Sequence, residues 1–178
     1  MPNKAYHNLR GKGYADVTLP SGLGHLQKGH GVAFADLDFD GDLDIFCQMG
    51  GAFRSDKFHN ACFENPGFGN HWVKIRLVGT VSNKAGVGSR IRAEITEDGE
   101  SRSVYVTVST GASFGCNPLQ QHIGLGKATK IDVLEVFWPA SNTTQVFKDL
   151  PVDRRIRITE GSEELEISEE KPIPFRKG

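Results

Sequence analysis

The chain has 178 residues, of which 38% are hydrophobic and 24% are charged, and its formal net charge is −1. This composition is typical of a water-soluble globular protein, and the balance of 21 basic against 22 acidic residues argues against nucleic acid or an anionic membrane as a partner. No apolar run reaches the roughly 20 residues of a membrane-spanning helix. Residues 1–20 carry no cationic-then-apolar leader, so we expect any export signal to lie outside this chain.

The first part of the chain, residues 1–70, is predicted to form short strands around an acidic turn. The apolar segments "GVAFADL" and "DIFCQM" flank this turn, and "ACFEN" follows them. A hinge rich in Gly, Pro and Asn, "NPGFGN", then separates this part from the rest of the chain.

The three cysteines, Cys47, Cys62 and Cys116, lack the spacing of a structural zinc site. Cys47 and Cys62 lie on two neighbouring predicted strands. A disulfide between them in an oxidising compartment and a pair of free buried thiols are both open interpretations. We expect Cys116 to be a buried thiol.

The second part, residues 71–162, shows the period-two alternation of half-buried strands. In "HWVKIRLVG" the alternation predicts that Val73, Ile75 and Leu77 face the core, while Lys74 and Arg76 face solvent. The segments "SRIRAEIT" and "RSVYVTVST" repeat the pattern on either side of "EDGE", whose Asp-Gly favours a hairpin turn.

Three further strands complete this part. "IDVLEVFWP" is apolar on both faces and is predicted to be a central strand, and "QVFKDL" and "RRIRIT" follow it. Six strands without a helical period predict an all-β sandwich or barrel. The charged, Pro-interrupted residues 163–178 are predicted to be a mobile tail, with one edge strand at "LEI".

The acidic turn contains five aspartates with the spacing of a metal-binding loop, D-x-D-x-D-G-x-x-D. Alternate carboxylates in a tight loop converge on one point, and Gly41 allows the positive φ that turns the chain back around it. Without a cation, each pair of like charges would repel by about 1–4 kcal/mol. Hard oxygen ligands without His or Cys favour Ca²⁺. The spacing predicts four carboxylate ligands, from Asp36, Asp38, Asp40 and Asp44. It predicts the backbone carbonyl of Asp42 as a fifth ligand.

Two other structures could contain such a turn, an EF-hand and an ordinary hairpin. An EF-hand needs a Glu at position 12 and flanking helices, whereas position 12 is Cys47 and both flanks are rich in strand-forming residues. An ordinary polar hairpin turn is the alternative without a metal, although it does not require five aspartates.

The motifs also resemble known families. "GVAFADLDFDGDLDIF", with the junctions "AYHNLRGKGYADVT" and "NACFENPG", resembles the FG-GAP or VCBS-type repeat of calcium-loop β-propellers. The segments "HWVKIRLVGTVSNKAGVGSRIRA", "GASFGCNPLQQHIGLGKA" and "IDVLEVFWPAS" resemble the ASPIC/UnbV domain, which follows such repeats in bacterial secreted proteins. The expected fold is therefore all-β, with one propeller-like blade of an incomplete propeller packed on a C-terminal β-sandwich.

These resemblances imply an extracellular or periplasmic, non-enzymatic calcium-binding module for adhesion or interaction. A protein or glycan on a cell surface or matrix is the expected partner. A propeller needs about four blades, so we expect either a fragment of a longer protein or self-association through an open blade edge.

Two other functions remain open. Carbohydrate binding would use the Gly- and amide-rich loop between residues 109 and 126, through Phe114, Asn117, Gln120 and Gln121. Metal-assisted hydrolysis would use His30 in "GHGVAF", close to the aspartates in sequence, as a general base.

Overall fold

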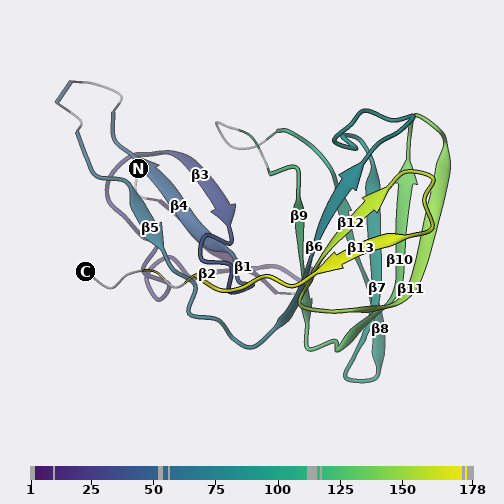
Figure 1. Ribbon diagram of the computed structural model, residues 1–178. Helices are drawn as coiled ribbons and strands as arrows, with labels where there is room; N and C mark the ends of the chain where they lie inside the picture. The colour runs from purple at the N-terminus through teal and green to yellow at the C-terminus, as the bar shows by residue number, and fades with distance from the viewer. Residues whose placement is uncertain are drawn as a thin grey trace. The chain divides into compact units, whose positions relative to one another are not determined.

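The structure, a computed structural model, describes residues 3–9, 11–51, 54, 55, 57–111, 116, 118–173 and 175. The described residues form thirteen β-strands and no helix, which confirms the predicted all-β class (Figure 1). In this part of the chain there is accordingly no helix with the length and apolarity needed to cross a membrane.

The chain divides into two compact units. The first contains the described residues of Met1–Ala35 and Leu43–Asn65. The second contains those of Asp36–Asp42, Pro66–Gly111 and Cys116–Gly178.

The first unit consists of two small antiparallel sheets. Strands β1 and β2 form a two-stranded sheet, and β3, β4 and β5 form a three-stranded sheet in that order. The bounds of these strands are Tyr6–Asn8, Tyr14–Asp16, Gly29–Ala35, Asp44–Met49 and Ala61–Phe63.

The strand register in this unit rules out the disulfide interpretation. Cys47 on β4 lies opposite Ala61, whereas Cys62 on β5 lies opposite Phe46. Because successive residues of a strand point to opposite faces, the two thiols face away from each other. Cys47 is buried and Cys62 is exposed, and both are free. The expectation for Cys116 was also wrong, because this cysteine is exposed.

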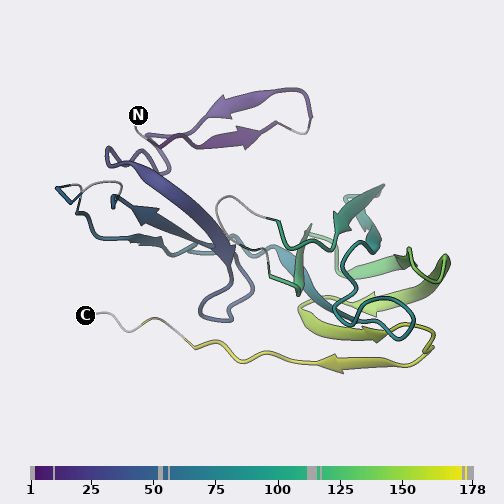
Figure 2. The same cartoon turned by 90° about the horizontal axis from the view of Figure 1, so that it is seen from above.

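The second unit is a sandwich of two four-stranded sheets (Figures 1 and 2). One sheet has the order β11-β10-β7-β8 and the other β13-β12-β6-β9. All neighbouring strands are antiparallel except β12 and β6, which are parallel. In chain order from β6 to β13 the bounds are His71–Val78, Arg90–Glu97, Glu100–Thr107, Gln121–Gly126, Lys130–Trp138, Thr143–Pro151, Arg154–Thr159 and Leu165–Ser168.

Both sheets contribute alternate residues to one apolar core. The predicted inward residues of β6 and β7 are buried, and β10 lies between β7 and β11 as the predicted central strand. The hairpin between β7 and β8 also follows the prediction, because Asp98 and Gly99 have the two positive φ angles, 54° and 82°, of a type I′ turn. The largest fully buried side chains are Trp138, Ile75, Leu77, Ile91, Ile95, Ile123, Leu125, Ile131, Leu134, Ile156 and Ile158.

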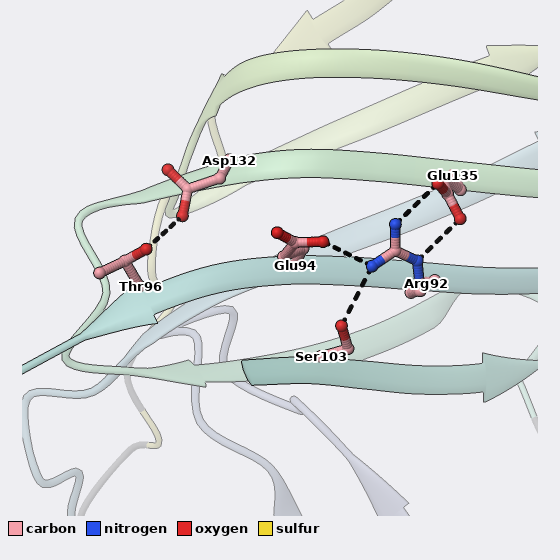
Figure 3. Close-up of polar contacts among 6 residues, drawn as sticks. All are labelled: Arg92, Glu94, Thr96, Ser103, Asp132 and Glu135. Carbon is pink, nitrogen blue, oxygen red and sulfur yellow. Dashed lines mark hydrogen bonds and ion pairs between the residues drawn. The ribbon is translucent and has the colours of Figure 1, made fainter. Parts of the chain in front are cut away.

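A polar network on β7 holds its sheet in register (Figure 3). The Arg92 guanidinium donates to both carboxylate oxygens of Glu135 on β10 at 2.7 Å, and also to Glu94 and to the Ser103 hydroxyl on β8. A bidentate Arg–carboxylate pair fixes geometry more tightly than a single contact. The hydrogen bonds that Arg92 donates to Glu135 and Glu94 raise the pKa of the guanidinium group.

The buried Glu160, just after β12, ties together a loop of the sandwich. One of its carboxylate oxygens accepts the backbone N–H groups of Thr80, Val81 and Ser82 at 2.7–2.9 Å, and the other accepts two hydroxyl groups, from Ser82 and Ser141. Burial alone would raise the pKa of Glu160, but these hydrogen bonds lower it to about 2.

Candidate metal centre

The aspartate loop, residues 36–42, follows β3 and is built from side-chain-to-backbone hydrogen bonds. Asp36 Oδ2 accepts the N–H of Gly41 at 2.9 Å, Asp38 Oδ1 accepts that of Asp40, and Asp40 Oδ1 accepts that of Asp42. Gly41 has the positive φ, 100°, that its position in the motif predicts. The short polar side chains thus stabilise the turn that brings them together.

Three of the five predicted ligands converge in this loop. One carboxylate oxygen each from Asp36, Asp38 and Asp40 lies within 4.8 Å of the other two. The Asp36 side chain is 2% exposed, and its Oδ1 is buried without a hydrogen-bond partner in the described part of the chain. An unsatisfied buried carboxylate oxygen is costly, and an ordered water or a cation would satisfy it.

The other two predicted ligands have different surroundings. Asp42 lies at the end of the loop with its Oδ2 close to Gly67, where a Cβ atom would lie only 2.7 Å from it. Asp44 belongs to the first unit as the first residue of β4, and its buried carboxylate accepts the N–H of Asn65 at 2.9 Å. Metal ligation by Asp42 and Asp44 therefore stays a prediction.

Lys74 is the residue that the sequence interpretation misplaced. The period-two pattern predicted that it faces solvent, but it is 3% exposed. Its ammonium group lies 2.8 Å from Asp36 Oδ2, also pairs with Glu170, and lies over the rings of Phe39 and Trp72 at 5.3 and 5.0 Å. Lys74 therefore faces the aspartate loop, and these contacts replace water around its charge.

The beginning of the C-terminal segment also contacts the loop. The predicted edge strand is present as β13, paired with β12. After it, the Glu170 side chain is only 10% exposed beside Lys74, and the N–H of Ile173 donates to the backbone oxygen of Asp38 at 2.6 Å. Glu170 and Ile173 thus make contacts within the second unit that the prediction of a mobile tail did not include.

Two aromatic residues pack against the turn itself. Trp72 on β6 stacks on His122 of β9 with ring centroids 5.7 Å apart, and a Cβ atom at Gly41 would overlap the Trp72 indole. Burial lowers the pKa of His122, and the Lys74 ammonium lowers it further, against opposing effects from Asp36, Glu170 and a hydrogen bond to the Gly41 backbone. His122 is therefore held in its neutral form beside the loop.

Solvent reaches this site through a surface cavity of about 460 Å³ in the second unit. Asp40 and Phe39 line it together with Trp72 and residues of the C-terminal segment, among them Glu169 and Glu170. Asp40 is exposed, whereas Asp36 and Asp38 are more enclosed. An ion could therefore enter at Asp40 and reach the enclosed oxygens behind it.

The other candidate residues do not form a second site in the described part of the chain. Phe114 and Asn117 lie outside the described residues. Gln120 is half-buried, and Gln121 begins β9 and donates its amide to the backbone oxygens of Pro118 and Leu119. His30 lies on β3 in the first unit, and its Nε2 is buried without a hydrogen-bond partner among the residues that the structure describes.

Comparison with known proteins identifies part of the chain. Residues 79–165 match the ASPIC and UnbV family, so the chain contains an ASPIC/UnbV domain. No curated protein matches the chain. The match covers most of the sandwich, while the aspartate loop and the whole of β6 precede it. The FG-GAP or VCBS-type repeat stays a prediction.

Proposed function

We propose that the chain is a non-enzymatic calcium-binding module in which Ca²⁺ has a structural role in the aspartate loop. The observation that carries the proposal is the convergence of Asp36, Asp38 and Asp40, together with the buried, unpartnered Oδ1 of Asp36. A divalent cation would satisfy this oxygen and remove the repulsion among the three carboxylates.

The charges around the loop support a cation. The single ammonium of Lys74 contacts Asp36 and Glu170, and it is one positive charge among four carboxylates when Asp38 and Asp40 are included. The cluster contains only oxygen ligands, which suits a hard cation. Ca²⁺ fits better than Mg²⁺, because Mg²⁺ demands near-ideal octahedral geometry and gives up its water reluctantly.

A structural calcium ion would hold the loop in one conformation in a module whose function is to bind other molecules. In this proposal the module is secreted, extracellular or periplasmic, where millimolar calcium can fill a weak site, and it binds a protein or glycan on a cell surface or matrix. Edge strands β3 and β5 of the three-stranded sheet offer a route to self-association. Carbohydrate binding by the loop around Phe114 gains no support from Gln121, whose amide is used within the chain.

Thermal unfolding of calcium-stripped protein, with CaCl₂ or MgCl₂ added at equal ionic strength, tests the proposal. At about ten times the dissociation constant, Ca²⁺ should stabilise the fold by about 1.4 kcal/mol, and Mg²⁺ should stabilise it less. Asp40→Asn, at an exposed position, should keep the fold and lose this response. An equal response of the parent chain and the variant would contradict the proposed site.

A further inference from the structure

The outer face of the sheet β13-β12-β6-β9 carries a second group of charges, of the opposite sign. We call Arg76, Lys84, Arg155 and Arg157 the basic patch. In the parallel register Arg157 on β12 lies directly beside Arg76 on β6. Both point away from the core, because their neighbours Ile75, Leu77, Ile156 and Ile158 are buried.

The positive charges of the basic patch are poorly compensated. Arg157 contacts Glu166 on β13 at 3.4 Å, between exposed side chains. Within the described part of the chain no acidic residue pairs with Arg76, Lys84 or Arg155. Lys74, two residues before Arg76 on β6, has two carboxylate partners instead. Like charges side by side on neighbouring strands destabilise a sheet. The pair of Arg76 and Arg157 therefore lowers the stability of the fold when no anion is bound.

These residues surround a hollow of suitable size. A cavity of about 380 Å³ is lined by the basic patch together with Leu77 and Val78. This volume lies within the range of pockets that take small ligands. The planar guanidinium group donates two parallel hydrogen bonds to an oxyanion, and two such groups from neighbouring strands can hold one anion from both sides.

We propose that the basic patch is a binding site for a small ligand that carries a phosphate or sulfate group. The anion would lie between Arg76 and Arg157, offset their repulsion and accept charge-assisted hydrogen bonds from both. Arg155 and Lys84 would lie at the edges of the site. The overall charge of −1 argues for local recognition of one group and not for general attraction of a polyanion. This inference does not rest on the calcium proposal.

The experiment uses the calcium-free 178-residue chain, from which any chelator has been removed. Sodium phosphate or sodium sulfate should raise the melting temperature more than sodium chloride at equal ionic strength, and calorimetry should give one site. The double variant R76Q/R157Q should lose this response while being at least as stable as the parent chain in chloride, because the repulsion is gone. R90Q, at an exposed arginine of the other sheet, is the matched control and should respond like the parent chain.

Three probes distinguish the source of the anion. Glucose 6-phosphate, glucose 6-sulfate and a short single-stranded oligonucleotide are titrated into the parent chain and the double variant. Tighter binding of one monoester, lost in R76Q/R157Q, supports the site and assigns its chemistry. Equal anion responses of the parent chain and R76Q/R157Q would overturn the proposal, and so would binding of the oligonucleotide in preference to both monoesters.

Discussion

The ammonium group of Lys74 lies 2.8 Å from the Asp36 carboxylate, and both side chains are almost completely buried. This pair links β6 of the sandwich to the aspartate loop, within the second unit. Asp36 Oδ2 thus has two partners, the Lys74 ammonium and the Gly41 N–H, while Oδ1 has none in the described chain. Lys74 should therefore stabilise the calcium-free loop. Its positive charge should also weaken the attraction of the loop for Ca²⁺.

Lys74→Met separates these two effects, because methionine keeps an apolar stem and removes the charge. In calcium-free buffer the free energy of unfolding should fall by about 3–5 kcal/mol, since Asp36 is left buried with one partner fewer. Added Ca²⁺ should then stabilise the variant more than it stabilises the parent chain. Urea unfolding with and without Ca²⁺ measures both quantities, and an equal or smaller calcium response in the variant would contradict the account.

The matched control for this experiment is Lys148→Met. Lys148 is exposed on β11, so its replacement should change the free energy of unfolding by at most about 0.5 kcal/mol and leave the calcium response as it is.

Glu170→Gln tests whether the C-terminal segment is bound to the loop through Lys74. The Glu170 carboxylate is 10% exposed, so loss of its charge should destabilise the fold by about 1–3 kcal/mol. Glu169→Gln is the control, because Glu169 is 74% exposed and only pairs with Arg154 at the surface. Urea unfolding that ranks the two variants equally would show that the segment adds little through this contact.

Gly41→Ala should destabilise the second unit by more than 1 kcal/mol and weaken calcium binding. The new Cβ would overlap the Trp72 indole, and alanine disfavours the φ of 100°. Gly99→Ala separates the two causes, because Gly99 also has a positive φ but has open space around it. Equal destabilisation of both variants by chemical denaturation would mean that backbone strain alone acts at Gly41.

Glu160→Gln should remove part of the acid sensitivity of the sandwich. The pKa of Glu160 is about 2 in the folded chain and 4.5 as its ordinary value, so the unfolded chain binds the proton first as the pH falls. The stabilisation by this carboxylate is thus complete above pH 4.5 and is lost as the pH falls toward 2. The difference in melting temperature between the parent chain and the variant should shrink from pH 7 through pH 4.5 to pH 3. A difference that stays constant would refute the assignment.

His122→Gln should change the pH dependence near neutrality. Burial and then Lys74 lower the pKa of His122 below its ordinary value of 6.5, so protonation favours the unfolded chain. Stability should therefore decline as the pH falls below 6.5 in the parent chain and decline less in the variant. Melting curves at pH 7.5, 6.5 and 5.5 measure this difference, and parallel declines in both proteins would count against a neutral buried His122.

Much of the fold could be predicted because it depends on local patterns. The alternation in β7 places Ile91, Ala93 and Ile95 in the core, and Asp98-Gly99 fixes the following turn. The aspartate spacing likewise brings Asp36, Asp38 and Asp40 together, because the loop is held by hydrogen bonds between residues two to five positions apart.

The errors arose where distant segments meet. Lys74 has the position of a solvent-facing residue on β6, yet residues 36–42 and Glu170 cover it, and a period-two pattern contains no information about such contacts. The disulfide interpretation of Cys47 and Cys62 failed for a related reason. Neighbouring strands were predicted correctly, but a difference of one residue in register places Cys47 and Cys62 on opposite faces. The buried ion pair between Lys74 and Glu170 depends on both the register of β6 and the course of the chain after β13.

The central claim is that the aspartate loop is a calcium site, and a calorimetric calcium titration of metal-stripped protein tests it most directly. The account predicts a stoichiometry near one, with a dissociation constant of about 10⁻⁴–10⁻³ M, and no measurable binding in Asp40→Asn. Absence of binding heat in the parent chain, together with an unchanged melting temperature in millimolar Ca²⁺, would show that the three carboxylates form only a polar turn.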